Sequence, residues 1–578
     1  MNKTLLLALA AFFVLSSCDD LFTPAIENNR GLEDMYGEAE YAQGILLNGY
    51  TRIPTNGWSF NDVATDDAVS NDNSNDYREI ATGQWTANNN PLSQWTNAKA
   101  AIQYMNIFLA EADKVTWATD EAVSAMFRDR LKGEAYGLRA LYMYYLLQAH
   151  GGWGPNGELL GVPILLEPEQ TDSDFNKERA TFEACMQQLY SDVAQAEQLL
   201  PLDFEDAAEL PDGYTNLDDY NRVFGHYARL RMTGRIAKAI RAQAALLAAS
   251  PAYSNGTSTT WEDAAHHAGE VLNLIGGVGG MDPNGATWYA NAGEINDLAS
   301  GTNPPEILWR SDVGESNDLE QQHFPPTLYG SGRLNPTQNL VDAFPMANGY
   351  PIADPASGYD PTQPYANRDP RLQRYILVNG STAGPSNTTI VTAADGTTND
   401  ALNRVETSTR TGYYLRKLLR QDVNLNPVTT NTQRHYKARI RYTELFLAYA
   451  EAANEAWGPM GMGAYGFSAY DVVAALRQRA GIAQPDTYLE SIKADPTAMR
   501  TLIRNERRLE LCFEGFRFWD LRRWNADLTE PAQGVRIEGG NHATIAVENR
   551  FFQDYMQYGP IPYSEILKFD ALVQNQGW

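Results

Sequence analysis

Apolar residues recur every three or four positions along two long parts of the chain. From Trp95 onward, Ile102, Met105, Leu109 and Ala112 share one face of a helix, because residues at this spacing lie above one another. Proline or glycine follows several such segments and would end a helix. The pattern predicts helices that begin at Trp95 and Asp120, and further helices over 181–200, 234–250, 261–274, 438–457, 469–479 and 496–514.

The segment between these two helical parts is different. Residues 276–434 are rich in Gly, Pro, Asn and Thr, and only short runs such as EILWR (306–310) and RYILV (374–378) are typical of strands. A long irregular region inside a folded chain is usually functional.

Together the patterns predict a mainly α fold in one domain, residues 18–578. Consecutive helices in antiparallel pairs suggest a tetratricopeptide-like scaffold over about 95–275 and 438–525, although the strict repeat of about 34 residues is absent. The loop-rich insert, over about 276–434, would carry the short strands.

The N-terminus has the features of a bacterial lipoprotein signal. Lys3 precedes an apolar run from Leu5 to Leu15, which is too short to span a bilayer and is typical of a signal peptide. The run ends in LSSC, where small residues before a cysteine are typical of a lipobox. We expect residues 1–17 to be removed and Cys18 to be lipidated, so that acyl chains hold the mature protein at a membrane.

Composition narrows the class of partner. The chain has 45 Lys and Arg against 72 Asp and Glu, a net charge of −27, which argues against a nucleic-acid partner because phosphates need a basic surface. Cys185 and Cys512 are the only cysteines after Cys18, so we expect no disulfide framework. The run DNSND (72–76) has oxygen ligands suited to calcium but lacks the glycine and the distant glutamate of an EF-hand loop. We therefore predict neither a metal nor a cofactor.

The stretch NERRLELCFEGFRFWDLRRWN, residues 505–525, mixes charges with large aromatic side chains; we call it the hallmark stretch. An enzyme would use Glu510, Glu514 and Asp520 as acid and base. Arginines beside each carboxylate would instead keep it ionised, which suits a structural role better. We interpret the stretch as a buried network in which Arg517 neutralises Glu510 or Asp520.

This stretch resembles the C-terminal signature of the SusD/RagB family, the surface nutrient-binding lipoproteins of Bacteroidetes. The tail departs slightly from the family pattern, since Phe569-Asp570 stands where the family usually has Asn-Pro. Other matches follow the family order: GEAYGLRALYMYYLLQAHGGWG (133–154), PTQNLVDAFPMANGYPI (336–352), NRDPRL (367–372), RIRYTELFLAYAEAANEA (439–456) and PIPYSEILKFDALVQNQGW (560–578).

The resemblance implies a binding protein rather than an enzyme. Family members sit on the outer face of the outer membrane and cap a SusC-like TonB-dependent transporter. They act as a lid that delivers an oligosaccharide, or in some members a peptide, without chemistry on the ligand. The resemblance also implies that Asp19 and Asp20 form a surface-export tag. Two alternatives remain: an oligopeptide binder of the same family, and a surface glycoside hydrolase, which would need two carboxylates about 5 to 10 Å apart.

A glycan site needs aromatic rings that stack on sugar faces and polar groups that bind hydroxyls. Trp85 lies among polar residues in ATGQWTANNN, where glycan-binding family members carry a loop platform. Because the candidate residues are richer in carboxylates and arginine than in rings, a fructan is the expected glycan. The predicted ligand-binding residues are Trp85, Asp67 and Arg368, joined by Asp66, with Trp288 and Tyr289 as the next candidates.

Overall fold

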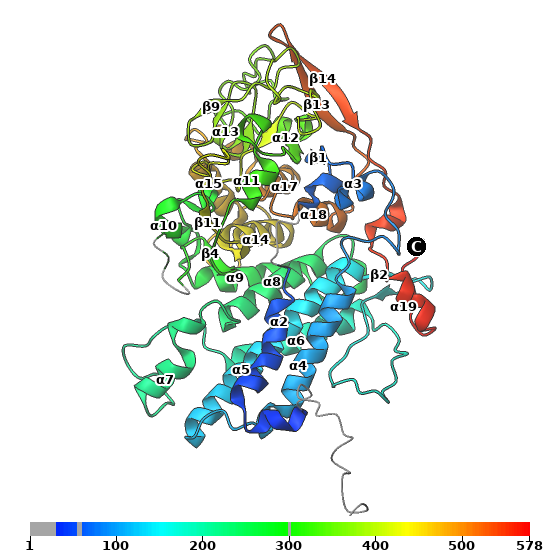
Figure 1. Cartoon of the computed structure of the whole chain (residues 1–578), viewed down its shortest axis with the longest axis vertical. Coiled ribbons are helices and arrows are strands. Elements are labelled where there is room, and N and C mark those ends of the chain that lie inside the picture. Colours follow the sequence, from blue (N-terminus) through cyan, green and yellow to red (C-terminus); the bar gives the residue numbers. More distant parts are fainter. Residues whose placement is uncertain (1–30, 55–59, 297, 299–301) are drawn as a thin grey trace, which may run out of the picture.

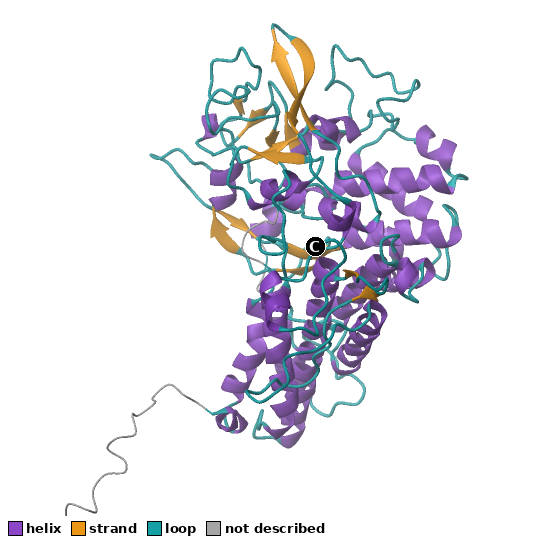
Figure 2. Ribbon diagram, turned by 90° about the vertical axis from the view of Figure 1, so that its right-hand side faces the viewer, coloured by secondary structure: helices purple, strands orange, loops and turns teal. Residues whose placement is uncertain are grey.

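The computed structural model describes residues 31–54, 60–296, 298 and 302–578. The predicted signal peptide and Cys18 lie outside this described part. The long helices between residues 39 and 199 form one end of the molecule, and the short strands, short helices and loops lie at the other end beside the helices between residues 442 and 510 (Figure 1, Figure 2). The mainly α fold with a loop-rich insert is therefore confirmed.

The helices of the first group lie side by side (Figure 1). α4 (Trp95–Glu111) packs on α5 (Glu121–His150), and α5 packs on α6 (Phe182–Leu199). α2 (Ala39–Thr51), which the sequence patterns did not predict, packs on α4 and α5. The connection from α4 to α5, residues 112–120, is short and returns the chain along the preceding helix.

Five helices form the second group: α8 (Gly234–Ala249), α9 (Trp261–Asn273), α14 (Tyr442–Trp457), α15 (Ala469–Ala480) and α17 (Pro496–Glu510). α9 contacts α8 on one side and α14 on the other, and α14 also contacts α15 and α17. Helices from before and after the insert thus form one continuous stack. The small alanines of α8, buried on most sides, allow this close packing.

The strands of the described residues form antiparallel pairs rather than one large sheet. The pairing of β4 with β12 brings the beginning of the insert against its end, so that the insert closes on the scaffold. The pairs are β1 (Ala68–Ser70) with β6 (Leu334–Pro336), β2 (Gly152–Trp153) with β3 (Leu159–Leu160), β4 (Ile307–Arg310) with β12 (Ala438–Arg441), β5 (Gly314–Ser316) with β11 (Gln433–His435), β7 (Ile376–Leu377) with β10 (Tyr414–Leu415), β8 (Thr382–Ala383) with β9 (Thr388–Thr389), and β13 (Ala532–Glu538) with β14 (Asn541–Glu548).

Short helices connect these elements. They are α3 (Asp76–Ala81), α7 (Leu217–Phe224), α10 (Ala292–Asn296), α11 (Asp318–His323), α12 (Gln338–Ala343), α13 (Pro370–Tyr375), α16 (Thr487–Ile492), α18 (Arg517–Arg523) and α19 (Tyr563–Lys568).

The loop-rich part has its own apolar core. Phe344, Tyr375, Leu415 and Phe513 are buried together there, separately from the core between the long helices. Irregular backbone in this part is therefore held by packing, which allows loops to carry a defined site.

Two predicted helix boundaries are wrong. Residues 438–441 form strand β12, and the helix begins only at Tyr442, because these residues pair with β4. The helix predicted to run to Glu514 ends at Glu510, and Gly515 then adopts a left-handed φ of 85° before α18 begins.

Candidate functional site

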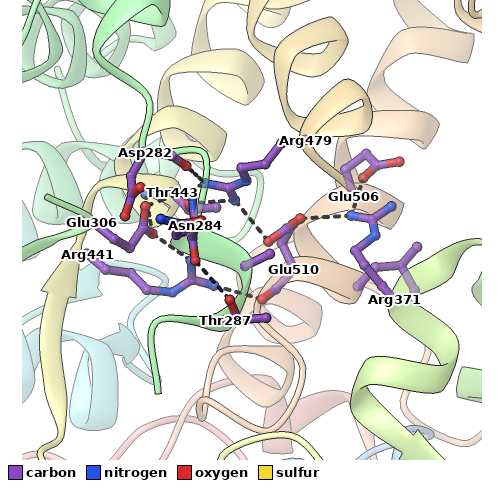
Figure 3. Close-up of polar contacts among 12 residues, drawn as sticks. Asp282, Asn284, Thr287, Glu306, Arg371, Arg441, Thr443, Arg479, Glu506 and Glu510 are labelled. Carbon is purple, nitrogen blue, oxygen red and sulfur yellow. Dashed lines mark hydrogen bonds and ion pairs between the residues drawn. The ribbon is translucent and has the colours of Figure 1, made fainter. Parts of the chain in front are cut away.

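The hallmark stretch lies in the interior, where its carboxylates meet arginines from other segments (Figure 3). Arg371 Nη1 lies 2.8 Å from Glu506 Oε2 and 3.1 Å from Glu510 Oε1. Arg479 Nη2 lies 3.2 Å from Glu510 Oε2. All four side chains are buried. The prediction of a buried structural network is confirmed.

The two glutamates that an enzyme would use as acid or base are held ionised. Burial alone would raise the pKa of Glu510, but the guanidinium groups of Arg479 and Arg371 lower it to about 2. The pKa of Glu514 is also lowered, because Arg441 and Lys417 outweigh its burial. A carboxylate held ionised in this way is a poor proton donor near neutral pH, which favours the structural role.

The predicted partners of Arg517 are wrong. Asp520 pairs with Arg507, 2.7 Å from Nε to Oδ2, and with Arg523, 2.9 Å from Nε to Oδ1. Arg517 instead reaches the loop before β1, where its Nη2 lies 3.0 Å from Asp66 Oδ2. It therefore ties the hallmark stretch to the N-terminal segment before β1.

Asp66 and Asp67, predicted to face a sugar, are buried in that contact. Asp67 is 0% exposed, and its Oδ1 accepts a hydrogen bond from Arg508 Nε at 2.7 Å. Arg508 Nη2 donates to Asp66 Oδ2, also at 2.7 Å. Burial would raise the pKa of Asp66, but Arg508 and Arg517 hold it well below its usual range. The expectation that these aspartates lie in an exposed loop is corrected: their charges are compensated inside the fold.

Trp85 is also an interior residue, with 2% of its surface exposed. Its ring makes edge contacts with Phe518 at 5.9 Å and with Trp578, the last residue, at 4.9 Å between centroids. Nε1 donates to Asn90 Oδ1 at 3.0 Å. The predicted exposed platform is therefore corrected, because polar neighbours in the sequence conceal a tryptophan that tertiary packing covers.

Arg368 is buried and directed to backbone carbonyls. Nη2 donates to the oxygens of Val341 and Phe344, each at 2.6 Å, and Nη1 donates to the oxygen of Pro364 at 2.8 Å. The side chain thus fastens neighbouring segments of the insert, which corrects the expectation of an exposed loop donor.

Trp288 and Tyr289 belong to the core of the loop-rich part. Their rings meet edge to face at 5.8 Å, and Trp288 also lies 5.4 Å from the ring of Tyr436. Trp288 is 1% exposed. The structure brings these two rings together, but it places them inside the protein.

The ligand-binding roles of these six residues stay predictions, and their burial argues against them. A ring without an exposed face cannot stack on a sugar, and a carboxylate already paired with arginine has little left to offer a hydroxyl.

A cleft of about 550 Å³ opens on the loop-rich part. The β5–β11 ribbon and α11 form its walls, together with Phe60, which precedes the short helix η2 (Asn61–Ala64). Its lining combines Phe60, Leu319 and Tyr436 with Asp312, Glu315, Asp318, Gln322, His323 and His435.

Three carboxylates in this lining are exposed: Asp312, Glu315 and Asp318. Carboxylate oxygens accept hydrogen bonds from hydroxyl groups, and Gln322, also exposed, can both donate and accept. Apolar walls with a few placed polar groups are the usual composition of a small-molecule site.

Two histidines give the cleft a neutral and a more basic group. His323 meets Phe60 edge to face at 4.6 Å, and neither ring nitrogen has a hydrogen-bond partner among the described residues. Burial lowers the pKa of His323 to about 3, so the ring is neutral, and with 4% of its surface exposed it forms part of the inner wall of the cleft. Burial alone would lower the pKa of His435, but the contact of its Nε2 with Glu320 Oε1 at 3.0 Å raises it.

Sequence reasoning missed this cleft because its walls are assembled from distant, individually ordinary segments. Strand β5 pairs with β11 through Gly314 and His435, which are far apart in the chain. The sequence did predict that the insert, residues 276–434, carries function. Most of the residues that line the cleft fall within this segment.

The DNSND run serves as a turn and a helix cap. Asp72 Oδ1 accepts from the backbone nitrogen of Ser74 at 2.9 Å, and the Asn75 side chain accepts from two backbone nitrogens at the start of α3. Among the described residues, no group of three or more His, Cys, Asp or Glu side chains could hold a metal ion.

Within the described part of the chain, every helix is too short or too polar to pass through a bilayer. The predicted lipid anchor at Cys18 lies outside that part.

Two family descriptions match the sequence. The SusD family matches residues 305–578, and a family described as starch-binding and associating with the outer membrane matches residues 34–212. The residues that line the cleft fall within these two ranges.

Solved structures share the fold over nearly the whole chain. A SusD-like protein from Bacteroides fragilis is 22% identical, with 94% of this chain and 98% of that chain covered and a TM-score of 0.69. A SusD-like carbohydrate-binding protein from the same organism is 21% identical, with 93% and 99% covered and a TM-score of 0.69. A laminarin-binding SusD-like protein is 21% identical, with 94% and 99% covered and a TM-score of 0.57. None of the curated proteins matches the chain.

Proposed function

This chain belongs to the SusD/RagB family, and from that premise we propose that it binds an oligosaccharide in the cleft beside α11. The observation that carries the proposal is the combination, in one open cleft, of exposed carboxylates, an exposed amide and apolar walls. This combination suits a ligand with many hydroxyl groups and apolar ring faces. The laminarin-binding protein of the same fold supports a glycan as the ligand class.

The proposed setting is nutrient uptake at the outer membrane. The family description of association with the outer membrane supports this location. We propose that Cys18 carries the lipid anchor, that the protein faces the cell exterior, and that it acts as the lid of a SusC-like TonB-dependent transporter. In this role the glycan is captured and handed on without bond cleavage.

Calorimetric titration of the purified protein with fructan, starch-derived and laminarin oligosaccharides tests the proposal. The fructan stays in the set because the exposed side chains of the cleft are carboxylates and an amide rather than aromatic rings. Asp318→Ala should weaken binding about tenfold or more, because a hydrogen bond to a charged group is worth about 1.5–3 kcal/mol. Asp218→Ala, an exposed aspartate at the start of α7, is the matched control and should leave the affinity unchanged.

The results separate the candidate functions. Binding of peptides but of no glycan would mean that the ligand is a peptide rather than an oligosaccharide. Release of reducing sugar from a glycan by the purified protein would indicate a hydrolase instead. Glycan binding that is unaffected by Asp318→Ala and by Gln322→Ala would move the site away from this cleft.

A further inference from the structure

A second and smaller cavity, of about 190 Å³, adjoins the cleft and shares Lys437 with it. Strand β12, helices α5 and α14, and the segment between α17 and α18 contribute to its lining. The aromatic side chains of Tyr77, Phe516 and Trp519 form part of its wall. Its volume is roughly that of six liquid waters, at about 30 Å³ each.

Three cations line this cavity within five consecutive residues. Lys437 lies just before strand β12, and Arg439 and Arg441 belong to the strand. The KARIR segment, residues 437–441, therefore gives the cavity a positive wall.

Arg439 has no carboxylate partner within ion-pairing distance among the described residues. Its Nε is buried and has no hydrogen-bond partner there. The guanidinium lies 4.6 Å from the ring centroid of Trp309, whose Nε1 donates to the oxygen of Leu230 at 2.9 Å. The cation is thus held in place by stacking rather than by a counter-charge, and a largely buried cation without a counter-charge is unfavourable.

The two carboxylates in the lining do not compensate it. Glu514 is engaged by Arg441, 2.7 Å from its Oε2, and by Lys417, 2.6 Å from its Oε1. Glu444 accepts from Gln243 at 2.6 Å, and burial raises its pKa to about 7, so it is only partly charged near neutral pH. Among the described residues, no carboxylate of the lining is therefore left to neutralise Arg439.

We propose that this cavity is a subsite for a carboxylate-bearing sugar unit, such as a uronic acid, with Arg439 as the group that pairs with the carboxylate. A planar guanidinium can bind a carboxylate through two parallel hydrogen bonds, and the aromatic wall provides a surface for the sugar ring. The inference rests on the proposed glycan-binding function and specifies its ligand: an oligosaccharide with an acidic unit next to neutral ones. A fructan lacks such a unit, so the fructan expected from the sequence and the acidic oligosaccharide proposed here are alternative ligands.

Calorimetric titration of the wild-type protein with galacturonate, galactose and acetate tests this inference without any substitution. We expect galacturonate to bind about tenfold or more tightly than galactose, the effect of one charge-assisted pair, and more tightly than acetate. Raising NaCl from about 50 to about 500 mM should weaken galacturonate binding and leave galactose binding unchanged. Equal affinities for galacturonate and galactose would overturn the inference, and acetate binding as tightly as galacturonate would overturn the assignment to a sugar.

Substitutions then locate the site. Arg439→Gln should reduce the affinity for galacturonate to that for galactose. Arg439→Lys should retain part of the preference for galacturonate over galactose. Arg536→Gln, an exposed arginine on β13, is the matched control and should retain all of it. Galacturonate selectivity that persists in folded Arg439→Gln would overturn the role of Arg439. If neutral oligosaccharides bind but acidic ones have no advantage, this inference fails while the proposed function stands; if no glycan binds, the proposed function itself fails.

Discussion

Arg508 binds Asp67 across 441 positions of sequence, with Nε 2.7 Å from Oδ1. The same guanidinium reaches Asp66, 2.7 Å from Nη2 to Oδ2. The contact joins the segment before β1 to α17, so that the loop-rich part is fastened to the helical scaffold by buried charges. The two aspartates that the sequence suggested as ligand-binding groups thus have a structural function in this fold.

Asp67→Asn should destabilise the protein by about 1.5–3 kcal/mol, because it removes one of the two carboxylates that pair with Arg508 and Arg517, and a hydrogen bond to a charged group is worth about that much. Unfolding in urea, followed by circular dichroism, measures the change. Asp218→Asn, on the exposed surface of α7, should be neutral. An Asp67→Asn protein with wild-type stability and weakened glycan affinity would restore the original binding prediction for this residue.

Trp85→Ala should cost about 3–5 kcal/mol of stability, since truncation of a buried tryptophan leaves a cavity among Phe518 and Trp578. Glycan affinity, measured where the variant remains folded, should stay at the wild-type value. Phe551→Ala is the matched control, because that ring is half exposed and should lose little stability. Lost affinity with unchanged stability would show that Trp85 is exposed to the ligand in solution.

The helices could be predicted because the signal for each is local. Asp120 accepts a hydrogen bond from Val123 N at the start of α5, as its position before an apolar periodic segment suggested. Helix periodicity also places the apolar faces without knowledge of the partner helix. The wrong start at residue 438 arose where a distant strand, β4, competes with helix formation.

The candidate site could not be predicted because burial in the loop-rich part depends on residues far away in the sequence. Trp85 has polar neighbours in its own loop, but the ring of the last residue, Trp578, lies 4.9 Å from it. The cleft likewise depends on the pairing of β5 with β11. No local pattern distinguishes Asp318, which is exposed in that cleft, from Asp67, which is buried.

Cys18→Ala should abolish membrane attachment, because acylation of this thiol is the anchor that the N-terminal sequence predicts. Fractionation of cells and labelling by antibody applied to intact cells measure the location. Cys185→Ala, which removes a buried free thiol, is the matched control and should remain at the outer membrane. Surface labelling of the Cys18→Ala protein equal to that of the wild type would contradict the lipid anchor.

Glu444 should make stability depend on pH in the direction opposite to an ordinary ion-paired carboxylate. Burial raises its pKa from 4.5 to about 7, while the nearby Arg507 and the hydrogen bond from Gln243 partly counteract this rise. The other groups that interact with its charge are Arg441, Glu514, Tyr144 and Tyr145. Because the folded pKa lies above the unfolded one, the folded state binds the proton more tightly, and this contribution to stability is lost as pH rises from about 4.5 to 7.

Glu444→Gln cannot ionise, and its amide oxygen can still accept the hydrogen bond from Gln243. The variant should therefore gain stability relative to the wild type as pH rises from 5 to 8, by an amount on the order of 3 kcal/mol, since one pKa unit corresponds to about 1.4 kcal/mol. Urea unfolding of both proteins at the two pH values measures the difference, and the comparison cancels the other groups that titrate in this range. Glu262→Gln, at an exposed position on α9, is the matched control. A stability difference that shrinks with rising pH would mean that Glu444 is charged and compensated in the folded protein, and the second cavity would then be less positive than its lining residues indicate.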